Sequence, residues 1–171
     1  MAIHLIIDGY NLIRQSPRWS LLDAMDLEAG REALLEALAA YRHNRPQCRL
    51  TVVFDGWQGG ELKETRDLFQ GVKVVFSRRG ERADEVIKRL VAKERQRALV
   101  VSSDRELQEC ADRVGATWVG ASHFETAYLS GNSGDLSKDE HDHPIQGTKK
   151  KGPARRKSKR ERQRQQRLKK L

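Results

Sequence analysis

The stretch LIIDGYNLI, residues 5–13, decides the fold, because an apolar run ends in the carboxylate of Asp8 and passes straight into a turn that carries the amide of Asn11. Such a run is typical of a strand buried in a parallel sheet. In open α/β sheets, ligands bind in the crevice outside the carboxyl ends of the strands. We therefore expect Asp8 and Asn11 to lie at the functional edge of a sheet.

Four further apolar runs, rich in Val and Ile, alternate with segments of helical periodicity. The runs lie near residues 50–54, 72–76, 98–102 and 117–119, and the helical segments near 26–42, 61–70, 83–91, 107–114 and 122–129. Regular alternation of this kind predicts a three-layer α/β/α domain with a central, mainly parallel five-stranded sheet. The last helix is expected to begin at a capping box formed by Ser122 and Glu125.

Acidic residues follow four of these strands. Asp8 ends the first, Asp55 follows the second, Asp84 follows the third through a short loop, and Asp104 follows the fourth. Parallel neighbours would bring these carboxylates to one edge, where like charges are costly unless they are protonated or bridged by a cation. A hard divalent ion with oxygen ligands, Mg²⁺ or Mn²⁺, is the natural cofactor for such a cluster.

The charge of the chain is divided unevenly along its length. Residues 149–171 hold 13 of the 33 Lys and Arg and one of the 24 acids, which leaves residues 1–148 with 20 basic and 23 acidic groups, or −3, against +12 for the tail. We therefore expect a domain over residues 1–130, a polar linker over 131–148 and a basic tail over 149–171 that is disordered, or helical on an anionic surface. Lys149, Lys150, Lys151, Arg155 and Arg156 are candidate RNA-binding residues of this tail.

Composition also suggests where the protein works. No run of about 18 apolar residues is present, which argues against a membrane partner. Cys48 and Cys110 have no partner at metal-binding spacing and are expected to be free thiols. A soluble cytoplasmic protein is the expectation. Neither GxxxxGK[ST], GxGxxG nor GxSxG occurs, which argues against P-loop, dinucleotide and serine-hydrolase chemistry.

Four motifs together resemble those of a YacP-like member of the NYN family, within the PIN-like nuclease superfamily. They are IIDGYN at 6–11, VFDG at 53–56, ADEVI at 83–87 and VSSDRE at 101–106, and the resemblance covers about residues 1–130. It implies a metal-dependent ribonuclease in which Asp8, Asp84 and Asp104 bind Mg²⁺ or Mn²⁺. Asn11 would orient an acid or a substrate phosphate.

The fourth acidic position is open. Glu106 occupies a place, two residues after Asp104, where many PIN-like enzymes have another acid. Related NYN nucleases have an acid four residues after Asp104, where this chain has Gln108. Glu85 and Asp55 are the alternatives to Glu106.

Each acid also has a purely structural interpretation. Asp8 can cap a helix that follows the first strand, and Asp84 can favour the first turn of its own helix through the helix dipole. Ser103 and Glu106 match a capping box, and Asp55 can serve as a turn residue before Gly56.

Several residues are candidates for holding the substrate. Trp57 can stack on a base or pack at the rim, and Arg78, Arg79 and Arg82 can hold phosphates or form a solvated charged run. The resulting hypothesis is an endoribonuclease acting on mRNA or ribosome-associated RNA. The alternative is a non-catalytic RNA-binding or ribosome-associated adaptor. A phosphatase of the haloacid dehalogenase type is the weakest option, because Tyr10 occupies the position where that chemistry needs a second acid.

Overall fold

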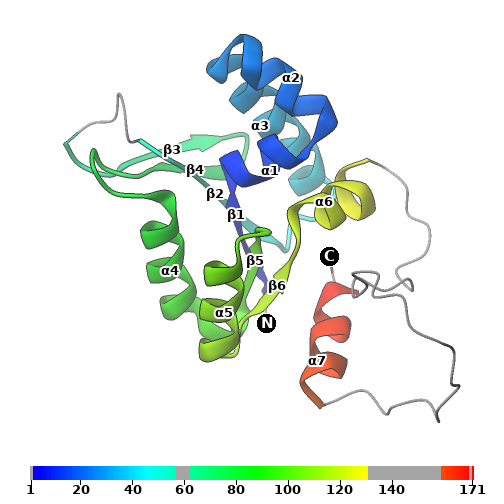
Figure 1. The fold of residues 1–171 in the computed structure, drawn as a ribbon. Coiled ribbons are helices and arrows are strands. Elements are labelled where there is room, and N and C mark those ends of the chain that lie inside the picture. The colour runs from blue at the N-terminus through cyan, green and yellow to red at the C-terminus, as the bar shows by residue number, and fades with distance from the viewer. Residues whose placement is uncertain (1, 57–61, 131–158, 170) are drawn as a thin grey trace, which may run out of the picture.

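The protein forms three layers, with helices on both faces of one central sheet (Figure 1). The computed structural model describes residues 2–56, 62–130, 159–169 and 171. The strands are β1 (His4–Asp8), β2 (Arg49–Phe54), β3 (Thr65–Phe69), β4 (Val72–Phe76), β5 (Ala98–Val101) and β6 (Thr117–Val119), in the spatial order β3-β4-β2-β1-β5-β6. Every neighbouring pair is parallel except β3 with β4. The predicted α/β/α class and all five predicted strands are confirmed.

The helices of the described residues divide between the two faces of the sheet. They are α1 (Gly9–Gln15), α2 (Pro17–Met25), α3 (Leu27–His43), α4 (Ala83–Glu94), α5 (Arg105–Val114), α6 (Ala121–Phe124) and α7 (Lys159–Leu168), with a 3₁₀ turn at Arg95–Arg97 and a π turn at Glu125–Leu129. None of them is both long and apolar enough to cross a membrane. The last predicted helix begins at Ala121, and its N-cap residue is Gly120, which has no side chain to cap it. The capping box expected at Ser122 was therefore wrong.

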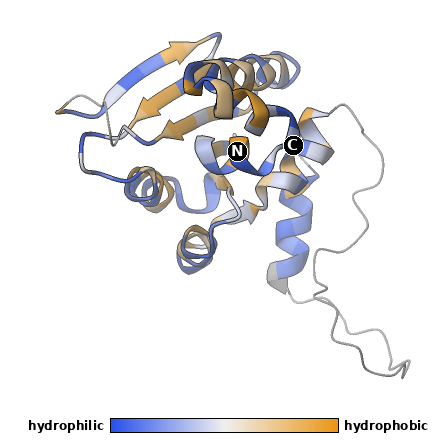
Figure 2. Cartoon of the chain, turned by 45° about the horizontal axis from the view of Figure 1, so that its top comes forward, coloured by the Kyte–Doolittle hydropathy of each residue, from blue (hydrophilic) through white to orange (hydrophobic). Residues whose placement is uncertain are grey.

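The pleat of the strands determines which layer each side chain joins. Leu5 and Ile7 belong to the core beneath α1, α3 and α6, whereas Ile6 packs with α4 and α5. Successive residues of a strand alternate between faces, so Asp8 is directed to the same side as Ile6. In Figure 2 the inner strands are predominantly hydrophobic, the edge strand β3 is mixed and α7 is predominantly hydrophilic.

Helix α2 was missed by the sequence analysis, whereas α1 was considered as a helix that Asp8 could cap. Ser16 caps α2 by accepting a hydrogen bond from the Trp19 N–H at 3.2 Å, and Pro17 occupies the first helical position. A serine followed by proline is a start signal that could have been recognised. Periodicity could not find α2, because Leu21 and Met25 are exposed and leave the helix without a clear apolar stripe.

The segment 61–70, predicted to hold a short helix, contains β3, so the sheet has six strands rather than five. Gln70 and Gly71 form a two-residue turn to β4, with φ of 45° and 87°. Positive φ at both positions is what a tight hairpin turn needs, because its twist matches that of the strands. The turn at Gln70 and Gly71 therefore indicates the antiparallel strand β3 better than its own weak alternation of polar and apolar residues does.

The end of the basic tail packs against the domain. The Arg164 guanidinium lies 3.8 Å from the centre of the Trp118 ring, and Arg167 donates to the Gly115 carbonyl at 3.3 Å. The Tyr41 hydroxyl donates to the Leu171 carbonyl at 3.0 Å, and Leu171 is buried in the main core. The tail was expected to be disordered or helical, and Lys159–Leu168 form helix α7. Its contacts with the domain use arginine and main-chain groups as well as Leu168 and Leu171.

Gly9 allows α1 to begin directly against β2. A Cβ atom at this position would overlap the Phe54 ring, which packs edge-on against Tyr10 at 5.3 Å and stacks on Phe76 at 5.6 Å between ring centres. The close approach of backbone to ring places the turn that carries Asp8 and Asn11 at the sheet edge. Glycine is required here for space rather than for its backbone angle.

We expect Gly9→Ala to lower the free energy of unfolding by about 1–3 kcal/mol, because the added methyl overpacks a filled core. Urea unfolding followed by circular dichroism measures the loss. Gly9→Ala combined with Phe54→Leu should be more stable than the two separate losses predict, because the smaller side chain makes room. Additive losses would contradict the proposed contact.

Candidate active site

Asp8 lies at the junction of β1 and α1 and is 8% exposed. It caps α1, since its Oδ1 accepts a hydrogen bond from the Asn11 N–H at 3.2 Å, so the structural interpretation of Asp8 is correct as far as it goes. Its other oxygen, Oδ2, accepts from the Ser102 hydroxyl at 3.4 Å. Asp8 forms no ion pair with any described residue, which leaves its charge without a cationic partner there.

Ser102 connects Asp8 to the next acidic loop and was missed by the sequence analysis. It is fully buried, and its Oγ also accepts a hydrogen bond from the Asp104 N–H at 3.1 Å. A serine directly after an apolar strand and two residues before an acid was the available signal. One hydroxyl therefore fixes the carboxylate of Asp8 and the backbone of Asp104 relative to each other.

Asn11 braces the same loop from the other side. Its Oδ1 accepts a hydrogen bond from the Ser103 N–H at 2.9 Å, while its own N–H donates to Asp8. The Ser103 hydroxyl donates to Gln15 at 2.8 Å. The amide predicted to orient an acid or a phosphate therefore holds the backbone between β5 and α5 in place.

Asp104 caps α5, with its Oδ1 accepting from the Glu106 N–H at 2.7 Å and the Leu107 N–H at 3.3 Å. The capping box proposed for Ser103 and Glu106 was wrong, because the cap residue is Asp104 itself. Glu106 instead pairs with Lys88, whose Nζ lies 3.2 Å from its Oε2 and 3.2 Å from an oxygen of Glu85. These two glutamates are turned toward a shared lysine between α4 and α5.

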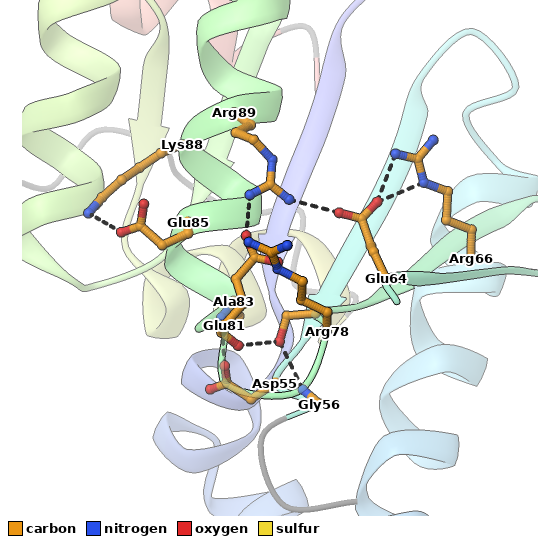
Figure 3. Close-up of polar contacts among 11 residues, drawn as sticks. Asp55, Gly56, Glu64, Arg66, Arg78, Glu81, Ala83, Glu85, Lys88 and Arg89 are labelled. Carbon is orange, nitrogen blue, oxygen red and sulfur yellow. Dashed lines mark hydrogen bonds and ion pairs between the residues drawn. The ribbon is translucent and has the colours of Figure 1, made fainter. Parts of the chain in front are cut away.

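Asp84 lies in the first turn of α4 and is 8% exposed. Its Oδ2 forms an ion pair with the Arg82 guanidinium at 2.7 Å. Asp55 reaches the start of the same helix, where its Oδ1 accepts from the Ala83 N–H at 2.5 Å (Figure 3). Asp55 is therefore more than a turn residue, because it ties the end of β2 to the start of α4.

The remaining candidates for substrate binding differ in their surroundings. Arg78 forms an ion pair with Glu81 at 3.5 Å and Arg82 pairs with Asp84, while Arg79 is exposed and forms no ion pair with a described residue. Several predicted residues lie outside the described part of the chain: Trp57, Lys149, Lys150, Lys151, Arg155 and Arg156.

The charges of four aspartates influence one another at this edge. Burial raises the pKa of Asp8 from 3.8 to about 6, and the charges of Asp84 and Asp55 add to the rise, against the hydrogen bonds from Asn11 and Ser102. Burial also raises the pKa of Asp84, with Asp104 and Asp55 acting in the same direction and Arg82 opposing them. Asp55 and Asp84 therefore repel the charge of Asp8, and Asp55 and Asp104 repel that of Asp84. That Asp8, Asp84 and Asp104 converge on one cation stays a prediction.

The donor types at this edge fit a hard divalent cation, because all four side chains are carboxylates. Their mutual repulsion is the penalty that such a cation would relieve. Among the described residues, however, no three side chains of His, Cys, Asp or Glu form a group that could hold a metal ion. The chemistry of the donors fits Mg²⁺ or Mn²⁺, and their present positions do not make a closed cage.

The fold and the acidic edge define a PIN-like α/β/α protein, and comparison with known proteins gives the family. The family model of the YacP-like NYN domain matches residues 5–171, so the chain belongs to that family. The crystal structure of Rae1 (YacP) from Bacillus subtilis is similar, with a TM-score of 0.62 and 29% identity over 76% of this chain and 75% of that one. The structure of a variant of that protein gives a TM-score of 0.60 and 27% identity over 75% and 76%.

A curated relative is similar over a shorter region. It is the uncharacterized protein YacP of Bacillus subtilis (strain 168), which is 36% identical over 88 residues, or 50% of this chain. The match spans 49% of that protein, so the chain covers about half the length of this relative. The resemblance found in the sequence motifs is confirmed at the level of the family.

The raised pKa of Asp8 has a consequence for stability. The folded state holds the Asp8 proton more tightly than the unfolded state. Protonated Asp8 therefore adds to the free energy of unfolding below about pH 4, and this stabilisation is lost as the pH rises to about 6. Asparagine keeps the cap and does not ionise. In EDTA, we therefore expect Asp8→Asn to be more stable than the wild type at about pH 7, by at most about 3 kcal/mol, and the difference to shrink toward about pH 4.

Urea unfolding across this pH range measures the difference. Asp26→Asn is the matched control, because Asp26 is also a cap residue, its side chain accepting from the Glu28 N–H at 2.9 Å, but it is exposed. This variant shows what the loss of a cap carboxylate does at an exposed position, and the profile of Asp8→Asn is compared with it. A flat profile for Asp8→Asn would show that Asp8 carries no buried charge.

Proposed function

We propose that this protein is a divalent-metal-dependent endoribonuclease that cleaves phosphodiester bonds of RNA at the carboxyl edge of its sheet. Membership of the NYN family supports a nuclease. The observation that carries the proposal is Asp8, a buried carboxylate held by two hydrogen bonds, repelled by two neighbouring acids and lacking an ion pair among the described residues. Such a charge destabilises the fold unless it serves a ligand.

Asp8, Asp84 and Asp104 would hold Mg²⁺ or Mn²⁺. One oxygen of Asp84 and one of Asp104, and both oxygens of Asp8, are engaged in hydrogen bonds or an ion pair that fix the direction of the carboxylate. When bound, the metal supplies neutralisation of the acids and an activated water for attack on a phosphate. Asn11 and Ser102 position the acids, as their contacts with Ser103, Asp8 and Asp104 indicate. Glu106 remains a candidate fourth ligand, although Lys88 competes for its carboxylate.

Arginines beside the acids give the site its attraction for a phosphate backbone. The Arg82 side chain is 67% exposed although it pairs with Asp84, and Arg79 lies exposed in the same loop. Arg78 completes this basic loop, and Trp57 is proposed as a stacking partner for a base. Guanidinium groups suit phosphate recognition because they offer paired donors. The substrate proposed is mRNA or RNA associated with the ribosome, in the cytoplasm, where Cys48 and Cys110 stay reduced.

The activity is tested with an end-labelled RNA incubated with wild type or Asp8→Asn, with and without Mg²⁺ or Mn²⁺. We expect internal fragments only from the wild type with metal, and a loss of at least about 100-fold in rate for Asp8→Asn, because a ligand to the metal is removed. Asp26→Asn, which changes the exposed cap aspartate of α3, should cut normally. RNA affinity of Asp8→Asn should be retained.

The main competing function is a non-catalytic RNA-binding adaptor. A wild type that binds RNA but leaves it intact with both metals would favour the adaptor and contradict the nuclease. Shortening of the labelled strand from one end, without internal fragments, would contradict the endonucleolytic mode alone.

The role proposed for residues 149–157 is sequence-independent attraction to RNA. Removing the whole tail would also remove α7 and its contacts with the domain, so we replace Lys149, Lys150, Lys151, Arg155 and Arg156 by glutamine. The salt dependence of RNA binding should become shallower, by about 0.7 in the log–log slope for each phosphate that the protein no longer neutralises. Equal slopes for this variant and the wild type, measured by fluorescence anisotropy, would contradict a role for the segment.

A further inference from the structure

A cavity of about 680 Å³ lies on the α4 side of the sheet, away from the aspartates. It is bounded by α4 and by the strands β2, β4 and β3. Helix α4 packs mainly over β1, β2 and β5, so room is left between this helix and the β3–β4 hairpin (Figure 1). The volume is in the range of pockets that bind small ligands.

The strand register places an apolar floor and a polar rim in this cavity. Thr51 pairs with Lys73, which in turn pairs with Leu68, while Val75 pairs with Arg66 on the same face. Val75 is buried beside Val86 of α4, and both line the cavity. A ligand here would meet apolar surface below and charged groups around it.

The charged groups of the cavity favour an anion. Five basic side chains line it, Arg49, Arg66, Lys73, Arg89 and Lys93, against three acids, Glu64, Asp67 and Glu94, a surplus of two positive charges. Burial and the charge of Arg49 lower the pKa of the lining His4, so this imidazole is neutral at pH 7. The surplus contrasts with the net charge of −3 over residues 1–148.

Ion pairs hold part of the rim in a fixed position. Arg89 contacts Glu64 at 2.8 Å and also pairs with Glu81, while Arg66 contacts Glu64 at 2.7 Å (Figure 3). Two cations therefore share one carboxylate. Lys73 and Lys93 have no ion pair with a described residue, so they are available to an incoming anion.

At its other end the cavity closes on a buried polar network. The His4 Nε2 and Thr51 Oγ1 atoms are 2.7 Å apart, and His4 Nδ1 lies 3.3 Å from Glu94. Glu94 is 7% exposed and also contacts Arg97 at 3.2 Å. Buried polar groups that hold one another in this way give the cavity a rigid, polar end wall.

We propose that this cavity binds a nucleoside phosphate, with the phosphate held by Lys73, Lys93 and the fixed guanidinium groups, and with the nucleoside lying on the apolar floor. The source is either a free nucleotide or a nucleotide of the RNA strand; only the second source rests on the function proposed above. Helix α4 connects the two regions, with Arg89 and Lys93 roughly 8 and 14 Å beyond Asp84 at 1.5 Å per residue. Val86, Arg89, Leu90 and Lys93 line the cavity from the face of α4 opposite to Asp84, at about 100° per residue. A nucleotide of the strand in the cavity would therefore be a contact separate from the one at the aspartates.

The test uses the full chain in EDTA, so that binding is measured without cleavage. The variant Lys73→Glu/Lys93→Glu changes two exposed residues of the cavity and is compared with Arg18→Glu/Arg113→Glu, which makes the same charge change on exposed residues of α2 and α5. Calorimetry with adenosine monophosphate and anisotropy with a short single-stranded RNA are the two measurements. We expect the cavity variant alone to lose affinity, by about tenfold or more.

The outcomes separate the sources. Loss of adenosine monophosphate binding by the cavity variant alone supports a site for free nucleotides. If neither the wild type nor the variants bind adenosine monophosphate, and only the cavity variant loses affinity for RNA, the cavity is a site for a nucleotide of the RNA strand. If the two variants bind both probes equally well, the proposal is wrong. If inorganic phosphate competes for the cavity as strongly as the nucleotide does, the cavity does not recognise the nucleoside. A wild type that never cuts RNA would refute the nuclease without changing these results.

Discussion

The parallel register of β1 with its two neighbours is the constraint on which the site depends. Asp8 pairs with Val53 of β2, and Ile7 pairs with Val101 of β5. Asp55 and Ser102 therefore follow at the same edge, on either side of Asp8. A shift of one residue in β1 would turn Asp8 toward the core of Leu5 and Ile7 and away from Ser102, so the register of this strand fixes the position of the acid.

The aspartates serve the backbone and the proposed chemistry together. Asp8 and Asp104 each accept hydrogen bonds from the first turn of a helix, and Asp55 does the same for α4 from a neighbouring strand. The helix N-termini offset part of the mutual repulsion, because partial positive charge gathers there. This compensation is incomplete for Asp8, whose pKa stays about two units above that of a free aspartate. The residual penalty makes the edge receptive to a cation.

The sequence predicted the sheet and its acidic edge because both depend on short-range patterns. Buried strands are apolar runs, and the residues that end them lie at one edge whenever the strands are parallel. It failed at β3, whose identity depends on the turn at Gln70 and Gly71, and at α2, whose outer face is apolar and exposed. A helix in the tail was one of two expected states, but its packing on the domain was not foreseen, because the stacking of Arg164 on Trp118 is a contact between distant residues that composition does not encode.

At the acidic edge, the sequence could predict which residues are acidic and where they lie along the chain, but not how their side chains are oriented. Spacing predicted which acids approach one another, but the direction of each carboxylate depends on partners elsewhere in the chain. Asp84 pairs with Arg82, and Glu106 pairs with Lys88. The fold therefore brings the aspartates near one another, whereas the rotamers of their side chains decide whether the carboxylates can bind one metal ion together. These rotamers are held by exposed ion pairs, which are weak contacts that a divalent cation can outcompete.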